Sequence, residues 1–226
     1  MISAAILLQG TPATAAAEEA RMSLADLYLA GGWVMHIIAL LSFVALYIFI
    51  ERYIVIRKAS RTDGTFMNRI KDYMYEGKVD AALQLCRKTD SPQARMVEKG
   101  ITRLGRPLAD VTSAIENVGR LEIYKLEKGF PTLATIAGAE PLLGFFGTVI
   151  GMVQAFYQMS VAGNALDIST LSGGIYVALI TTVGGLIVSI LAFFGYNTLV
   201  VRVEKVVYNL EATSVEFMDI LNEPVK

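Results

Sequence analysis

The chain has 226 residues, with 20 Lys and Arg against 21 Asp and Glu, and 54% of its residues are hydrophobic. Only 18% are charged, whereas soluble domains average about 25%. One Cys and one His exclude a disulfide framework and a Cys/His zinc site built within one chain. The near-neutral charge balance gives no indication of nucleic-acid binding. The apolar surplus therefore predicts that much of the chain contacts lipid.

Three long apolar runs predict membrane-spanning helices. Residues 31–50 and 168–201 contain no charged side chain, and residues 129–166 contain only Glu140. About 20 apolar residues cross the hydrocarbon core as a helix, and the backbone there must satisfy its own hydrogen bonds. We therefore expect an all-α integral membrane protein with spans at 31–51, 129–160 and 170–201.

Basic residues beside the spans predict their orientation. The flanks after the first span, before the second and after the third carry Lys and Arg, whereas the connection at 161–169 has neither. The basic positions are Arg52, Arg57, Lys58, Arg61, Arg120, Lys125, Lys128, Arg202 and Lys205. By the positive-inside rule, the N-terminus lies outside and the C-terminus inside. Residues 161–169 then form a short external loop, and residues 202–226 a cytoplasmic helix or tail.

The segment at 1–30 is expected to be an external tail, with an interfacial helix at Ser23–Leu29. The apolar residues near Leu7 and the alanines that follow resemble a cleavable signal, but the basic n-region of such a signal is missing. In the first span, His36 lies three residues after Trp33. This position favours an interfacial hydrogen bond over proton transport.

Residues 52–128 are predicted to form a cytoplasmic helical region. Breaks are expected at Asp63–Gly64, Glu76–Gly77 and Gly105–Pro107, with a helix start at Asp90-Ser91-Pro92. Cys86 is expected to be a reduced, packed thiol. Without a turn cluster between Pro107 and Ser160, the sequence predicts a single helix of about 80 Å. The second span would be the membrane end of this helix, which projects into the cytoplasm.

Small residues repeat along one face of the second span and one face of the third. On the second span they are Ala137, Pro141, Gly144, Thr148, Gly151 and Ala155. On the third they are Gly174, Ala178, Thr181, Gly185 and Ala192, with Thr182 and Ser189 at the margin. Such faces let helices pack closely in lipid. The periodicity equally allows a polar-lined cavity enclosed by several copies of these two spans.

The segments Pro141–Met152 (PLLGFFGTVIGM) and Gly173–Leu186 (GGIYVALITTVGGL) resemble the two signature spans of the MotA/TolQ/ExbB proton-channel family. Three spans and one long cytoplasmic loop match its ExbB/TolQ branch, and the resemblance covers roughly residues 31–205. It implies a subunit of an ion-driven motor in the bacterial inner membrane, with no catalytic activity, cofactor or metal. ExbB-like chains form a ring, typically a pentamer, around an ExbD-like single-span dimer. Proton flow through the complex works a TonB-like protein that energises outer-membrane transport.

The resemblance also implies which residues line the ion pathway. The family's channel threonines correspond to Thr148 and Thr182, with Thr181 as an adjacent alternative. The small residues that pack the helices around the pore would be Ala137, Pro141, Gly144, Gly151, Gly174, Ala178 and Gly185. The family's proton-carrying Asp belongs to the partner's helix, and the three predicted spans of this chain contain no Asp.

Two positions depart from the family pattern. Many ExbB/TolQ chains have Glu where this one has Val177, and a small residue where this one has Glu140. Antiparallel spans would place Glu140 about 12 Å to the inner side of Thr148, and Val177 about 7.5 Å to the outer side of Thr182. The two positions then lie on opposite sides of the threonines, so the carboxylate has not simply moved between helices.

Glu140 nevertheless needs an explanation, because a charged carboxylate at the centre of a span costs about 2.5–3.5 kcal/mol. One hypothesis is that Glu140 lines the inner part of the pore, as a proton relay or as a ring that attracts cations. Oxygen ligands also suit Na⁺, so the sequence allows either a proton or Na⁺ as the transported ion. The alternative is a carboxylate hydrated near the cytoplasmic mouth, or one bonded to Thr132, Thr135 or a basic side chain.

The sequence favours an ExbB-like motor subunit, and two alternatives remain. A TolQ-like subunit would serve envelope integrity with other partners. A non-conducting membrane scaffold would use the small-residue faces only for assembly, and would tolerate Thr148→Ala and Thr182→Ala together. An intramembrane hydrolase needs a Ser-Lys, Ser-His or paired-Asp set at membrane depth. It is disfavoured, because the spans contain no Lys and no Asp.

Overall fold

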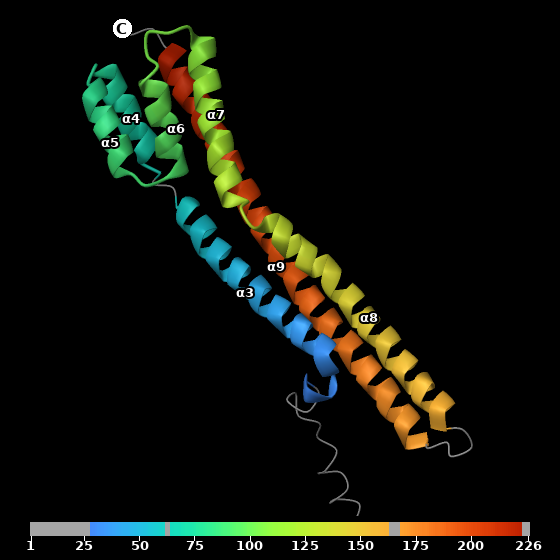
Figure 1. The fold of residues 1–226 in the computed structure, drawn as a ribbon. Coiled ribbons are helices and arrows are strands. Elements are labelled where there is room, and N and C mark those ends of the chain that lie inside the picture. The colour runs from blue at the N-terminus through green and yellow to red at the C-terminus, as the bar shows by residue number, and fades with distance from the viewer. Residues whose placement is uncertain (1–27, 62–63, 163–167, 223–226) are drawn as a thin grey trace, which may run out of the picture. The chain divides into compact units, whose positions relative to one another are not determined.

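The computed structural model describes residues 28–61, 64–162 and 168–222, and over these residues it is helical without strands. Its helices are α3 (Gly32–Ala59), α4 (Phe66–Tyr75), α5 (Val79–Lys88), α6 (Pro92–Ile101), α7 (Leu108–Leu126), α8 (Phe130–Ala162) and α9 (Ile168–Asn222) (Figure 1). The predicted all-α class is therefore confirmed over the part of the chain that the structure describes.

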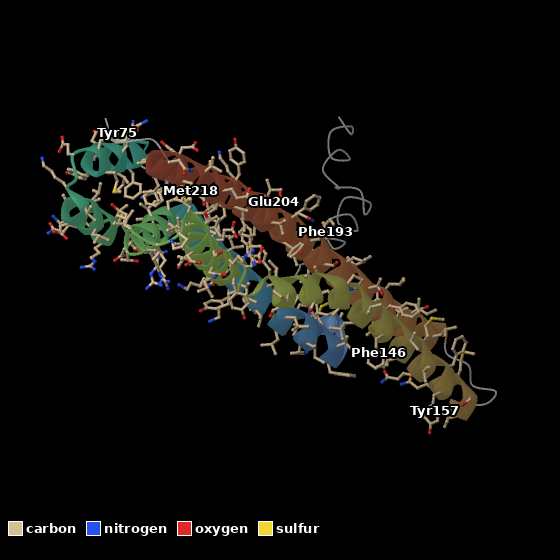
Figure 2. All side chains as sticks on the ribbon, turned by 90° about the horizontal axis from the view of Figure 1, so that it is seen from above. Tyr75, Phe146, Tyr157, Phe193, Glu204 and Met218 are labelled. Carbon is tan, nitrogen blue, oxygen red and sulfur yellow. The ribbon has the colours of Figure 1, made fainter. Side chains whose placement is uncertain are left out.

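Three stretches are long and apolar enough to cross a membrane: α3, the α7–α8 stretch and α9. Large apolar side chains cover their surfaces, and among them Phe146 on α8 is 49% exposed and Phe193 on α9 is 56% exposed (Figure 2). A water-facing surface rarely carries so much apolar area. The structure thus has three candidate spans, as predicted, whereas the bounds of the spans in the membrane and their orientation stay predictions.

The structure divides into two compact units. One contains the chain up to Leu40 together with Glu140–Ile187, and the other contains Leu41–Ala139 together with the chain from Val188 onward. Helices α3, α8 and α9 contribute residues to both units. The close contact between α8 and α9 around the threonines lies in the first unit, and the helical region α4–α7 lies in the second.

The core of the second unit contains the C-terminal half of α9. Phe217 is fully buried, and a Cβ added at Gly100 of α6 would lie 2.5 Å from its Cε1 atom. The Thr112 hydroxyl of α7 lies 3.5 Å from the sulfur of Met218. Met218 is near the end of α9 and is labelled in Figure 2. The Gln93 amide also donates to the carbonyl oxygen of Asn209 at 3.5 Å. Helix α9 is thus both a membrane-span candidate and part of this core.

The predicted single helix from Pro107 to Ser160 is wrong. Helix α7 ends at Leu126 and α8 begins at Phe130, and between them Gly129 has a φ of +89°. A residue with a side chain rarely adopts that conformation, whereas glycine does so freely. Pro131 follows in the first turn of α8, where its missing N–H costs no helical hydrogen bond. The long uninterrupted helix is instead α9, with 55 residues.

The other predicted features of the helical region are present. Gly77, which follows α4, has a φ of +69°, and Gly105, which follows α6, has a φ of +84°. The Ser91 hydroxyl accepts a hydrogen bond from the Ala94 N–H at 3.2 Å, with Pro92 in the first turn of α6. Cys86 is 2% exposed, and burial raises the pKa of its thiol to about 12. At neutral pH this thiol is therefore a packing group and not a reactive thiolate.

Several predictions lie outside the described residues. They are the external tail and most of the interfacial helix at Ser23–Leu29, the break at Asp63, and most of the loop at 161–169.

Candidate ion-pathway site

The small-residue faces of α8 and α9 meet within one chain. A Cβ added at Gly144 would lie 3.0 Å from the Thr181 carbonyl oxygen, and one added at Gly151 would lie 3.1 Å from the Gly174 carbonyl oxygen. Ala155 and Ala178 are 2% and 1% exposed. Only hydrogen atoms fit between backbones at this separation, so glycine and alanine allow the two helices to approach.

Thr148 of α8 and Thr182 of α9 form a hydroxyl pair across this contact. Their Oγ1 atoms share a short hydrogen bond in which either atom can be the donor. The Thr182 hydroxyl is also 3.0 Å from the Gly144 carbonyl oxygen, and the Thr148 hydroxyl is 3.1 Å from the Ala178 carbonyl oxygen. Both side chains are partly exposed.

The hydroxyl pair can arrange its two hydrogens in two ways. Thr148 can donate to Thr182 while Thr182 donates to the Gly144 carbonyl, or Thr182 can donate to Thr148 while Thr148 donates to the Ala178 carbonyl. Both arrangements satisfy every hydroxyl hydrogen, because a threonine hydroxyl both donates and accepts. The pair therefore offers a polar, switchable contact without a fixed charge.

Thr181 has a different environment from its neighbour. It is 1% exposed, and its hydroxyl donates to the carbonyl oxygen of Ala178 in its own helix at 2.8 Å. A Cβ added at Gly147 would lie 2.5 Å from its Oγ1 atom. Thr181 is thus packed beneath Gly147, and it is Thr182 that pairs with Thr148.

Glu140 is a buried carboxylate without a hydrogen-bond partner. It is 0% exposed, and neither side-chain oxygen has a partner among the described residues. A Cβ added at Gly185 would lie 2.5 Å from its backbone carbonyl oxygen, so α9 passes directly against it. A buried charge without a partner costs several kcal/mol. Glu140 therefore needs a bound proton or a partner from beyond this chain.

None of the alternative partners considered for Glu140 bonds to its carboxylate among the described residues. The Thr135 hydroxyl donates to the Pro131 carbonyl oxygen at 2.8 Å, and Thr132 is exposed. Within the described residues no basic side chain forms an ion pair with Glu140.

The contacts fix the register of the two antiparallel helices. Thr148 lies beside Thr182, Glu140 lies beside Gly185, and Gly151 lies between Gly174 and Ala178. Val177, one residue before Ala178, is therefore on the other side of the hydroxyl pair from Glu140. The expectation that Glu140 and position 177 lie on opposite sides of the threonines agrees with this register.

Ser189 makes a contact with α8 that the sequence interpretation did not predict. Pro141 has no N–H, so the carbonyl of Ala137, four residues earlier in α8, lacks its helical donor. The Ser189 hydroxyl of α9 donates to that carbonyl oxygen at 2.7 Å. The signal was present as a proline inside a helix and a serine on the facing helix, but only the register brings them together.

His36 makes a local contact at the start of α3. Its Nδ1 donates to the Gly32 carbonyl oxygen at 3.0 Å, and its ring lies 5.2 Å from that of Tyr28. His36 therefore forms a hydrogen bond, as expected, and its position at the membrane interface stays a prediction. Among the described residues, no group of three or more His, Cys, Asp or Glu side chains is placed to hold a metal ion.

Comparison with known proteins gives a consistent picture. The model of the MotA/TolQ/ExbB proton channel family matches residues 88–212. A protein described as a biopolymer transport ExbB homolog from Methanothermobacter thermautotrophicus is 29% identical over 187 residues, which cover 82% of this chain and 66% of that protein. TolQ of the Tol-Pal system from Haemophilus influenzae is 40% identical over 101 residues, which cover 45% of this chain and 44% of TolQ. The biopolymer transport protein ExbB of Xanthomonas campestris is 36% identical over 87 residues, which cover 38% of this chain and 34% of that protein.

Proposed function

The chain belongs to the MotA/TolQ/ExbB proton channel family, and we propose that it is the ExbB-like subunit of an ion-driven motor in a bacterial inner membrane. In this proposal copies of the chain, five as is typical of such rings, surround the transmembrane helices of an ExbD-like dimer. Proton flow through the complex works a TonB-like protein and so drives outer-membrane transport. The similarity to ExbB proteins supports the proposal.

The observation that carries the proposal is the Thr148–Thr182 hydroxyl pair. Each hydroxyl has lone pairs that can accept a hydrogen bond from a protonated group, and the hydroxyl that donates to a backbone carbonyl can release that bond to donate to an ionised group while the bond between the two threonines remains. An acid on a partner helix, passing a ring of such pairs, would meet a polar surface in both protonation states. The partner's carboxyl group carries the proton, and this chain provides the lining.

Glu140 would act on one side of the hydroxyl pair. Its carboxylate is buried and unpaired in the single chain, so a proton or a neighbouring cation would stabilise it. We place it as a relay that takes up the ion after it passes the threonines. A sodium ion would bind the same carboxylate oxygens, and the experiments below separate the two ions.

The threonine role is tested with the chain co-purified with its single-span partner and placed in proteoliposomes. The double variant Thr148→Ala, Thr182→Ala should lower the rate of proton uptake by about 100-fold, the scale of a lost proton-transfer group. Replacing both residues by Ser should preserve most of the rate, because the hydroxyls remain. Thr135→Ala is the control, since that hydroxyl serves only its own helix. Full uptake by the double alanine variant would remove the hydroxyl pair from the pathway, whereas no proton uptake by the wild-type complex would favour the scaffold alternative.

The Glu140 role is tested by Glu140→Gln in the same proteoliposomes. The amide keeps the size of the side chain but cannot take up a proton, so uptake should fall while the complex stays assembled. Glu127→Gln is the control, because Glu127 is exposed in the break between α7 and α8. Unchanged uptake at every pH tested would remove Glu140 from the pathway. Uptake that follows a sodium gradient instead would identify sodium as the ion.

A TolQ-like role is the second candidate, because the chain is 40% identical to Haemophilus influenzae TolQ over the matched segment, compared with 29% and 36% for the two ExbB relatives described above. Deleting the gene separates the two candidates. Loss of energy-dependent uptake with an intact envelope would favour the ExbB-like role, whereas detergent sensitivity with normal uptake would favour the TolQ-like role.

A further inference from the structure

A groove of about 550 Å³ runs along α3 and α9 in the second unit, and its lining includes none of the threonine-site residues. Its lining is mainly apolar and includes Leu46 and Phe49 of α3 and Val188 and Leu191 of α9. Ser42 is its first lining residue along α3, and Thr198 is its last along α9. All of these residues belong to the predicted membrane spans. The groove therefore opens where lipid chains surround the protein.

A basic residue lies directly beyond one end of the groove. Arg202 follows Thr198 by one helical turn, so the two share a face of α9. Tyr53 follows Phe49 by one turn on α3, and their rings are 5.9 Å apart. The Arg202 guanidinium lies 4.4 Å from the centre of the Tyr53 ring, and its NH2 donates to the Tyr53 hydroxyl oxygen at 3.2 Å.

The positive charge of Arg202 is not neutralised by this contact. Among the described residues no carboxylate lies within ion-pair distance of its guanidinium. The Tyr53 hydroxyl accepts the bond from Arg202 and keeps its own hydrogen to donate. The end of the groove thus presents donors and a positive charge, which complement a phosphate group.

We propose that this α3–α9 groove binds one phospholipid, with an acyl chain along the groove and the phosphate at Arg202 and Tyr53. The dimensions agree, because Val188 and Thr198 lie ten residues apart, about 15 Å along a helix, and half of a bilayer's hydrocarbon core is also about 15 Å thick. The lipid belongs to the leaflet whose headgroups are level with Arg202. The site is separate from the ion pathway and does not depend on the proposed function.

The test is native mass spectrometry of the full chain, delipidated in detergent and titrated with phosphatidylglycerol. Arg202→Gln should weaken binding about fivefold, the factor that one basic residue contributes beside anionic lipid, and Arg202→Lys should restore most of it. Lys205→Gln is the charge control, since Lys205 is exposed on the same helix but does not line the groove. Phosphatidylglycerol should bind more tightly than diacylglycerol, which lacks the phosphate.

A second pair of variants tests the groove itself. Thr198→Trp fills its end and should abolish the bound lipid, whereas Val201→Trp, at a 63% exposed position outside the groove, should leave it bound. Equal lipid binding by wild type, Arg202→Gln and Thr198→Trp would overturn the proposal. So would efficient disulfide cross-linking between two copies through Thr198→Cys in a Cys86→Ser background, because a second copy would then occupy the groove.

Discussion

Glu122 and Glu140 are both buried carboxylates, but the structure gives them opposite surroundings. Glu122 of α7 accepts hydrogen bonds from Arg95 at 2.6 Å and from Lys125 at 2.7 Å. Arg95 also bonds Asp90, which in turn bonds Lys58 at 2.7 Å, so positive and negative groups alternate across the helical region. Glu140 has no such partner in the part of the chain that the structure describes. The first carboxylate therefore stabilises the structure, whereas the second is retained at a cost that function must justify.

The charge on Glu122 should make stability depend on pH. Burial acts to raise the pKa of its carboxyl, but hydrogen bonds from Arg95 and Lys125 outweigh burial and hold that pKa below its ordinary value. A lowered pKa in the folded state means that the stabilisation is present above the unfolded-state pKa of about 4.3. It is lost as the pH falls through the lower folded-state value.

Replacing Glu122 by Gln should therefore lower the free energy of unfolding by about 2 kcal/mol at neutral pH, the scale of hydrogen bonds to charged groups. The difference from wild type should shrink in acid, where wild type also loses the charge. Denaturant unfolding of the detergent-solubilised chain between neutral and acid pH measures both effects. Glu116→Gln is the control, because Glu116 and Arg120 form an exposed pair 3.7 Å apart on α7, which contributes little. An equal loss from both variants would contradict this account.

At the scale of elements, glycines decide where the helices break, and a proline decides where a helix needs a side-chain donor in place of a backbone N–H. Gly129 lies in the break between α7 and α8. The sequence Gly129-Phe130-Pro131 contains a signal for this break, a glycine followed two residues later by a proline. Apolar periodicity masked it, because an apolar pattern continues across a tight helix break. Pro141 does not end α8, since the Ser189 hydroxyl supplies the donor that the Ala137 carbonyl lacks.

This compensation predicts a specific coupling between Pro141 and Ser189. Ser189→Ala should destabilise the chain by about 1 kcal/mol, because it leaves the Ala137 carbonyl without a donor. In a Pro141→Ala background the new Ala N–H satisfies that carbonyl, so Ser189→Ala should cost much less. Thermal or denaturant unfolding of the four variants measures the interaction energy as a double-mutant cycle. Additive effects would mean that the hydroxyl does not substitute for the missing N–H.

At the scale of the whole molecule, α9 serves two environments. Its N-terminal half carries Thr182 and the lining of the α3–α9 groove, and its C-terminal half provides Phe217 to the core of the helical region. The sequence predicted a cytoplasmic helix or tail for residues 202–226. In the structure, α9 continues without a break through Asn222, and the cytoplasmic location of this part stays a prediction.

Phe217→Ala should therefore destabilise the helical region by about 3–5 kcal/mol, the range for emptying a large buried site. The contact with Gly100 of α6 would be lost, and α6 and α7 would become susceptible to limited proteolysis. Val215→Ala is the matched control on the same helix, since Val215 is 62% exposed. Equal protease resistance of the two variants would show that the end of α9 does not stabilise this core.

The sequence alone determined the all-α class, the number of spans and most helix breaks, because charge-free runs, glycines and capping residues act through local chemistry. It also identified Thr148, Thr182 and Glu140 as residues of interest. Only the tertiary structure decided that Thr182 rather than Thr181 meets Thr148, that Ser189 serves Ala137, and that Glu140 has no partner within the described chain. These contacts depend on the rotation and register of two helices whose meeting residues lie more than 30 positions apart in the chain, and no local pattern specifies that register.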